Sequence, residues 1–171
     1  MDLEFRTAYA DALFYAHRIE DTIASRINDC PEHSAEDIPG LNAGERYNEL
    51  TKKYGDKEMR RMRLLVHAFL VIRKIRNLLT YAFLDNVGTE FRAEEGTDQV
   101  IAMLKEVAHW ERAYFTLLSH THDEPLRTHL TPIFKGEMHR DDLPSDAQLA
   151  RRRIRSHVSS LKQFHAQMIH P

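Results

Sequence analysis

The chain contains few of the residues that cross-link or interrupt a polypeptide. One cysteine, six glycines and six prolines occur in 171 residues. Because Cys30 has no second cysteine to pair with, a disulfide bond within the chain is excluded, and a reducing compartment such as the cytoplasm is the natural one. The glycines and prolines fall mainly between segments of helical periodicity, as is typical of a protein built from helices.

The sequence also has no long apolar run. Its longest is Leu64–Ile72, which His67 interrupts, whereas a helix that crosses a bilayer needs about 20 apolar residues. Residues 1–6 lack the basic start and the apolar stretch of a signal peptide. We therefore expect a soluble, cytoplasmic protein with no membrane partner.

Neither sign of charge is in excess. Lys and Arg number 24, Asp and Glu number 26, and the formal net charge is −2. Total charge therefore argues against broad non-specific binding to nucleic acid, but it leaves room for a local basic patch. The eleven histidines are many for this length, yet their number alone does not make a metal site.

Apolar residues recur at three- and four-residue spacing in most of the chain, which predicts amphipathic helices. Strand-like alternation does not persist anywhere, and no internal repeat is visible. We expect a single all-α domain, residues 1–171, folded as a bundle of four main helices plus short ones. The four main helices are expected at residues 2–28, 57–84, 97–120 and 147–168, and the short ones at 43–54 and 124–130.

Helix ends are predicted from capping residues. Gly55 is expected to stop the first short helix and Asp56 to cap the next helix. Thr97 or Asp98 should cap the third long helix after a polar loop at 90–96. Residues 132–144 are expected to be irregular.

The segment Arg73–Tyr81 places polar side chains directly after the apolar run. Polar groups beside a buried seam cost free energy unless they are paired or used. Arg73 and Asn77 share a helix face, and together with Arg76 they could hold a phosphate or a partner carboxylate. Arg76 and Tyr81 are five residues apart, which separates them by about 140° in an α-helix. The alternative is that these side chains line a solvated face and form salt bridges with acidic helices.

Within this segment, Ile75–Tyr81 (IRNLLTY) resembles the RNxxxH signature of the HEPN superfamily. The resemblance covers roughly residues 5–85, which are also similar to the mannitol-repressor type. It implies an all-helical fold, usually a dimer, of a kind common in toxin–antitoxin and antiphage systems. Many members of the superfamily are metal-independent endoribonucleases.

The match departs from the signature at one position. Arg76 corresponds to the arginine and Asn77 to the polar residue after it, but Tyr81 stands where the histidine is expected. Tyrosine, whose pKa is ordinarily near 10, is a poor base at neutral pH. The resemblance therefore implies a catalytically degenerate, dimeric module that binds RNA or a protein partner in a regulatory, toxin–antitoxin or defence role.

A second arginine–histidine group lies near the end of the chain. Arg152 and His157 fit the looser pattern of an arginine followed by a histidine, and Arg153 lies one helical turn before His157. Arg151 and Arg155 add positive charge. As an alternative function, the protein is a metal-independent endoribonuclease that uses Arg152 and His157, or Arg76 with Tyr81, across a dimer cleft.

This second group also has a plain explanation. Arginine followed by histidine arises easily in a chain rich in both, and Arg61 and His67 satisfy the pattern too. The alternative is that the arginines form a solvated, basic helix start.

One pair of residues has the spacing of a metal ligand set. Glu106 and His109 form an ExxH pair, but a di-iron bundle uses two such pairs plus carboxylates from two further helices. A metal-binding oxidoreductase bundle is therefore the weaker alternative. No Walker motif, dinucleotide-binding loop, CxxC pair or GxSxG elbow occurs, so no cofactor is expected. His67 is expected to be a satisfied core histidine.

Overall fold

The computed structural model describes residues 3–28, 43–83, 94–134, 144 and 147–170. These residues form α-helices and one π-helix without any strand, which confirms the all-α prediction. The elements are α1 (Leu3–Asn28), α2 (Ala43–Tyr54), α3 (Asp56–Asn77), η1 (Leu78–Phe83), α5 (Glu94–Ser119), α6 (Asp123–Phe134) and α7 (Ala147–Ile169). No described helix combines the length and the apolar character that spanning a bilayer requires.

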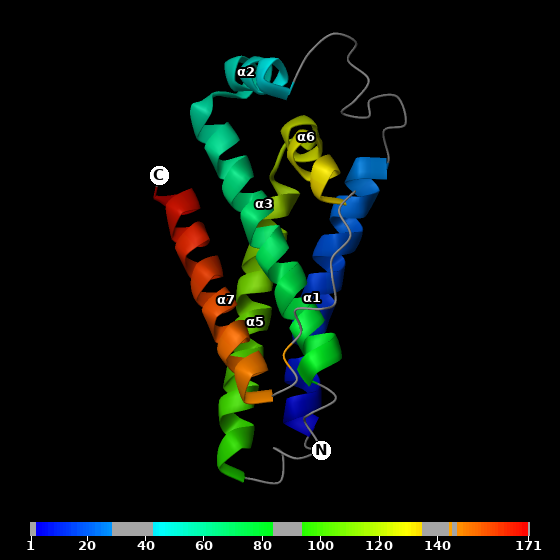
Figure 1. Ribbon diagram of the computed structural model, residues 1–171, viewed down its shortest axis with the longest axis vertical. Coiled ribbons are helices and arrows are strands. Elements are labelled where there is room, and N and C mark those ends of the chain that lie inside the picture. The colour runs from blue at the N-terminus through cyan, green and yellow to red at the C-terminus, as the bar shows by residue number, and fades with distance from the viewer. Residues whose placement is uncertain (1–2, 29–42, 84–93, 135–143, 145–146, 171) are drawn as a thin grey trace.

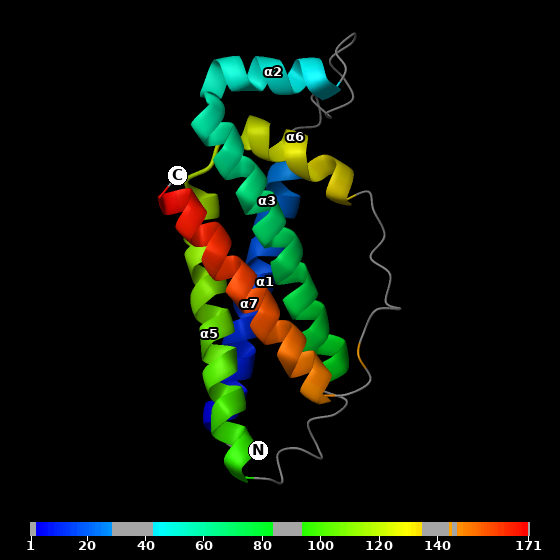
Figure 2. The ribbon, with the colours of Figure 1, turned by 60° about the vertical axis from the view of Figure 1, so that its left-hand side comes forward.

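The four long helices α1, α3, α5 and α7 lie side by side as a bundle (Figures 1 and 2). α3 runs opposite to the other three helices, and its main contacts are with α7. α1 packs most extensively against α5. α2 lies across one end of the bundle, and α6 lies below it at the same end (Figure 2).

The bundle interior is one contiguous apolar cluster built from a stripe on each long helix. On α1, three buried alanines, Ala8, Ala12 and Ala16, allow the backbone to approach α5 closely. On α5 the buried stripe follows an alternating four- and three-residue spacing, the seam expected for helices that pack nearly parallel. Its members are Val100, Leu104, Val107, Glu111, Tyr114 and Leu118.

Two predicted features of α3 differ in the structure. Gly55, at φ 86° and ψ 155°, is the N-cap residue, and Asp56 is the first residue of the helix. No side chain caps this end; instead the chain turns through a conformation that glycine alone adopts readily. At the other end, the expected helix to residue 84 changes at Leu78 into the π-helix η1.

The other helices agree with prediction except at some ends. α5 begins at Glu94, so residues 94–96 are helical, and Thr97 and Asp98 do not cap it. Acidic residues at a helix start interact favourably with the macrodipole, which explains the earlier start. α6 continues through Pro132 to Phe134, although Pro132 has no N–H to donate to the carbonyl four residues earlier. The remainder of the expected irregular segment, except Pro144, lies outside the described residues, as does Cys30.

Candidate functional site

Arg76 of the Arg-Asn pair is bonded to a carboxylate of the same chain. Its Nη2 donates a hydrogen bond to Oε1 of Glu20 on α1 at 2.9 Å, and Nε of Arg73 lies 3.7 Å from the same oxygen. The three side chains are only 17–19% exposed. These ion pairs join α3 to α1 and give both arginines a negative partner within the fold.

Glu111 on α5 adds a second carboxyl group to this region. It is fully buried, and neither of its carboxyl oxygens has a hydrogen-bond partner among the described residues. Burial raises the pKa of Glu111 well above its ordinary value of 4.5, and the negative charge of Glu20 raises it further. Both effects favour the protonated form of Glu111 over its charged form, next to a Glu20 carboxylate that two arginines contact.

Sequence reasoning missed Glu111, although a signal for it was present. The apolar stripe of α5 leaves a seven-residue gap between Val107 and Tyr114. A residue four positions after Val107 continues the seam, and Glu111 occupies that position. A charged residue type at an otherwise apolar seam position predicts a buried acid.

The Arg-Asn pair lies where the helix changes its geometry. Asn77 is the last residue of α3, and η1 follows directly. A π-helix bonds each residue to one five positions away and occurs often at functional sites. Tyr81 is 38% exposed, and Asn77 is half-buried.

A second bond ties this π-helix to the bundle. The Tyr9 hydroxyl on α1 donates to the carbonyl oxygen of Leu79 at 2.9 Å, and burial raises the pKa of Tyr9 to about 12. The Thr80 hydroxyl is buried with no described hydrogen-bond partner. η1 is therefore held against α1, with Tyr81 exposed on its outer side.

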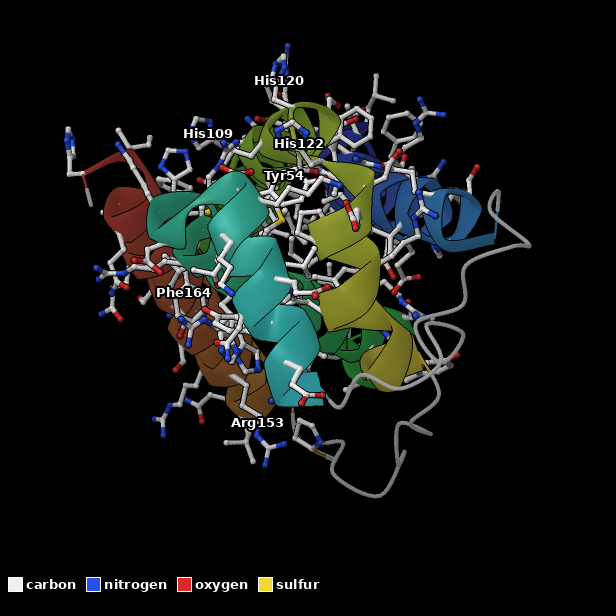
Figure 3. The ribbon with its side chains drawn as sticks, turned by 90° about the horizontal axis from the view of Figure 1, so that it is seen from above. Tyr54, His109, His120, His122, Arg153 and Phe164 are labelled. Atoms are coloured by element: carbon white, nitrogen blue, oxygen red, sulfur yellow. The ribbon has the colours of Figure 1, made fainter. Side chains whose placement is uncertain are left out.

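The start of α7 and the end of α3 form a basic surface. We call it the α7 basic face. Arg152, Arg153 and Arg155 are exposed, and Figure 3 shows Arg153 directed away from the bundle. It comprises Lys74 of α3 together with Arg151, Arg152, Arg153, Arg155 and His157, which are spread around the solvent side of α7 because residues two positions apart differ by about 200°.

Electrostatics show that two helices contribute to this face. His157 is half-buried, and its pKa is lowered by burial and then by the positive charges of Lys74 and Arg153. Lys74 on α3 therefore lies within electrostatic range of His157 on α7. The imidazole is neutral at neutral pH because cations on both helices oppose its protonation.

The two predicted arginine–histidine sites do not merge within one chain. Lys74 faces His157, whereas Arg76 faces Glu20. Lys74 and Arg76 are two residues apart, which separates them by about 200° around α3. Arg153 and His157 do come together, one turn apart on α7, as the spacing predicts.

The remaining candidates are dispersed. Glu106 pairs with Lys162 of α7, and His109 is exposed with its ring edge-on to Trp110 at 5.2 Å between centroids. Within the described ranges, no three His, Cys, Asp or Glu side chains form a group that could hold a metal ion. His67 is exposed rather than buried, so that expectation is wrong: it lies on the outer side of α3, against the Phe164 ring.

Comparison with known proteins assigns no relative. A scan against protein-family models, a search of curated proteins and a search of solved structures each found no match.

Proposed function

We propose that this chain is a HEPN-like, catalytically degenerate module that binds RNA through the α7 basic face. The observation that carries the proposal is the meeting of Lys74 and Arg153, from two helices, around His157. Clustered cations on one face of a nearly neutral protein are what a phosphate backbone requires. The choice of RNA over DNA, and a regulatory, toxin–antitoxin or defence role in the cytoplasm, rest on the resemblance of Ile75–Tyr81 to the HEPN signature.

The exposure of these cations supports an anionic ligand. Arg152 and Arg155, in the second and third turns of α7, are exposed and form no ion pair within the described part of the chain. A phosphate group bound there would neutralise the arginines.

Arg73 and Arg76 have a different part in this proposal. Because both are engaged by Glu20, they hold α3 against α1 and position η1. The element η1, which begins directly after Asn77 and carries Tyr81, packs against α7. RNA would reach the Arg-Asn segment from this side.

A homodimer is part of the same proposal. Tyr81 and Leu149 are both exposed apolar side chains, and the elements that carry them, η1 and α7, pack together. An apolar surface next to a basic one suits a dimer that presents two basic faces to one RNA. Light scattering coupled to size exclusion tests it: we expect a dimeric mass that Leu149→Glu reduces to that of a monomer.

The RNA-binding test compares two double variants that change the net charge equally. Arg152→Glu with Arg155→Glu alters the α7 basic face, and Arg6→Glu with Arg112→Glu alters exposed positions on α1 and α5. Fluorescence anisotropy with a labelled single-stranded RNA measures affinity at several salt concentrations. We expect the first variant to lose at least about tenfold in affinity and to lower the salt slope by about 0.7 for each phosphate contact removed.

Equal losses in both double variants would show attraction by total charge and overturn the assignment of the face. Failure of the wild-type chain to bind any RNA at low salt would overturn the proposal itself. In that case, a protein captured by the wild-type chain and lost from Arg152→Glu with Arg155→Glu would assign the face to a protein partner.

A metal-independent endoribonuclease remains the second candidate because of His157. A half-buried imidazole kept neutral by neighbouring cations has the protonation state of a general base. Incubation of RNA with the protein in EDTA tests this function. We expect cleavage to disappear in His157→Ala and to fall in Arg152→Ala, while Arg112→Ala leaves it unchanged; an RNA that stays intact with the wild-type protein excludes it.

A further inference from the structure

A cleft of about 350 Å³ lies at the other end of the bundle from the start of α7. Its wall is the first two turns of α3, and the ends of α5 and α7 close it below. Tyr54, labelled in Figure 3, borders it where α2 meets α3. The volume falls within the range of small-molecule sites, which is roughly 300–1,000 Å³.

The border of this cleft is held in place by hydrogen bonds between α2 and α6. The Tyr54 hydroxyl donates to Oε2 of Glu124 at 2.7 Å, and Nζ of Lys53 donates to the same oxygen at 2.6 Å. Gly55 then turns the chain directly into α3. These contacts fix the position of Tyr54 at the border of the cleft.

One side of the cleft is positively charged. Lys57, Arg60 and Arg61 are three and four residues apart, so they share one face of α3, and all three line the cleft. Among the described residues that line it, Glu58 is the one acid, and it lies 3.6 Å from Arg61. Lys57 and Arg60 are exposed and form no ion pair with any described residue. The excess of positive charge selects an anion.

The opposite side of the cleft is apolar. Leu64 continues the same face of α3 one turn below Arg60, and Leu117 and Met168 come from α5 and α7. Cations above an apolar floor match a molecule that has a negative group at one end and a hydrophobic body at the other. An inorganic anion would not cover the apolar side of the cleft, and a neutral apolar molecule would form no ion pair with its cations.

We propose that this cleft binds a small organic carboxylate with an aromatic or aliphatic body. The carboxylate lies between Lys57 and Arg60, and the apolar body rests on Leu64, Leu117 and Met168. The site is separate from the α7 basic face and does not depend on the RNA-binding proposal.

A matched set of four probes tests the two halves of this chemistry. Phenylacetate has both halves, 2-phenylethanol lacks the charge, 2-phenylethylamine reverses it, and acetate lacks the apolar body. Two-dimensional ¹H–¹⁵N NMR of the full chain follows each titration. We expect phenylacetate to bind with a Kd of about 1 mM, as suits so small a ligand, and to shift the amides of residues 57–64 and 167–168. The other three should bind at least about tenfold more weakly.

Three variants locate the site. Lys57→Glu with Arg60→Glu removes the positive side, and Gln167→Trp fills the cleft from an exposed position without changing the core. Lys52→Glu with Arg63→Glu makes the same change in charge next to the cleft without lining it. We expect phenylacetate binding to be lost in the first two variants and kept in the third.

The contrary results are equally clear. Equal binding of phenylacetate and acetate, or shifts that map to residues 151–157, would overturn the proposal. So would an equal loss in Lys52→Glu with Arg63→Glu. Because every readout concerns the amides around the cleft, RNA binding by the α7 basic face can fail without affecting this result.

Discussion

The negative charge of Glu20 on α1 acts on Glu111 on α5, although only Glu20 has arginine partners. Glu20 receives a hydrogen bond from Arg76, whereas neither oxygen of the buried Glu111 has a described partner. Burial, and then the nearby charge of Glu20, favour the protonated form of Glu111. The interior of the bundle therefore contains an acid whose charge state controls stability.

The pKa of Glu111 makes the protein less stable as the pH rises. The folded pKa lies above the ordinary value of 4.5, so between these two pKa values the native state holds more protons than the unfolded state. The stability contributed by this group is complete below about pH 4.5 and is lost as the pH rises toward the folded pKa. Urea denaturation at several pH values should show that the free energy of unfolding falls as the pH rises. Glu111→Met should make this dependence on pH weaker.

At pH 8 we expect Glu111→Met to exceed the wild-type free energy of unfolding by about 1–3 kcal/mol, because it removes a buried polar group that has no partner. The control is Glu106→Gln, since Glu106 is partly exposed and paired with Lys162. It should change stability little and keep the wild-type dependence on pH. If the free energy of unfolding of Glu111→Met changed with pH as steeply as that of the wild type, the dependence on pH would come from other groups.

Glu20→Gln tests the ion pairs between α1 and α3. It leaves Arg73 and Arg76 largely buried without a counter-charge. We expect a loss of about 2–3 kcal/mol, below the 3–5 kcal/mol of a fully buried pair because the side chains are partly exposed. A double-mutant cycle with Arg76→Met should give a coupling energy above about 1 kcal/mol. If the losses of stability in Glu20→Gln and Arg76→Met simply added up in the double variant, the 2.9 Å contact between the two residues would contribute no coupling energy.

Arg26 joins three elements, and its loss should be costly. Its guanidinium donates to the carbonyl oxygens of Leu118 and Thr121 at 2.7 and 2.6 Å and pairs with Asp123 at 2.6 Å. It thus satisfies the end of α5 and holds the start of α6. We expect Arg26→Ala to lower the free energy of unfolding by about 2–4 kcal/mol.

Arg26→Lys should restore less than half of that loss, since an ammonium group lacks the planar fork that reaches several oxygens. Arg18→Ala is the matched control on α1, because Arg18 is exposed and lies over the Phe14 and Phe115 rings. Equal effects of Arg18→Ala and Arg26→Ala in urea denaturation would contradict this role.

The pKa of His157 reports on the α7 basic face. It is lowered from its ordinary value of 6.5 by burial and by Lys74 and Arg153. Since the folded pKa lies below the unfolded one, this imidazole destabilises the protein as the pH falls below about 6.5. NMR titration of the ring should show that Lys74→Gln raises the pKa of His157. Lys105→Gln, at a lysine that pairs with Glu4, should leave it unchanged.

Helix positions could be predicted from the sequence because apolar spacing is a local property. The bounds of α1, α2 and α7 were expected within one residue. The π-helix was not predictable, because residues 78–83 are apolar and favourable in either helix type, so tertiary contacts such as Tyr9 with Leu79 decide the geometry. The exposure of His67 also depends on which side of α3 its neighbours cover.

The candidate site was predictable only in part. The sequence indicated that Arg73 and Arg76 need a negative partner, but it could not say that Glu20, over fifty residues earlier, supplies it. Long-range pairs of this kind depend on the order of helices around the bundle. The closeness of Arg153 and His157 follows from helical spacing alone, whereas the nearby Lys74 does not.

Gly55 determines where α2 lies. Its φ of 86° and ψ of 155° belong to a region that L-residues avoid, yet a Cβ atom there would meet no heavy atom within 4 Å. Substitution by an L-residue is therefore opposed by the backbone conformation and not by a lack of space for the side chain. A D-alanine introduced by chemical ligation would accept this backbone, whereas L-alanine would turn α2 away from Glu124 and open the border of the cleft.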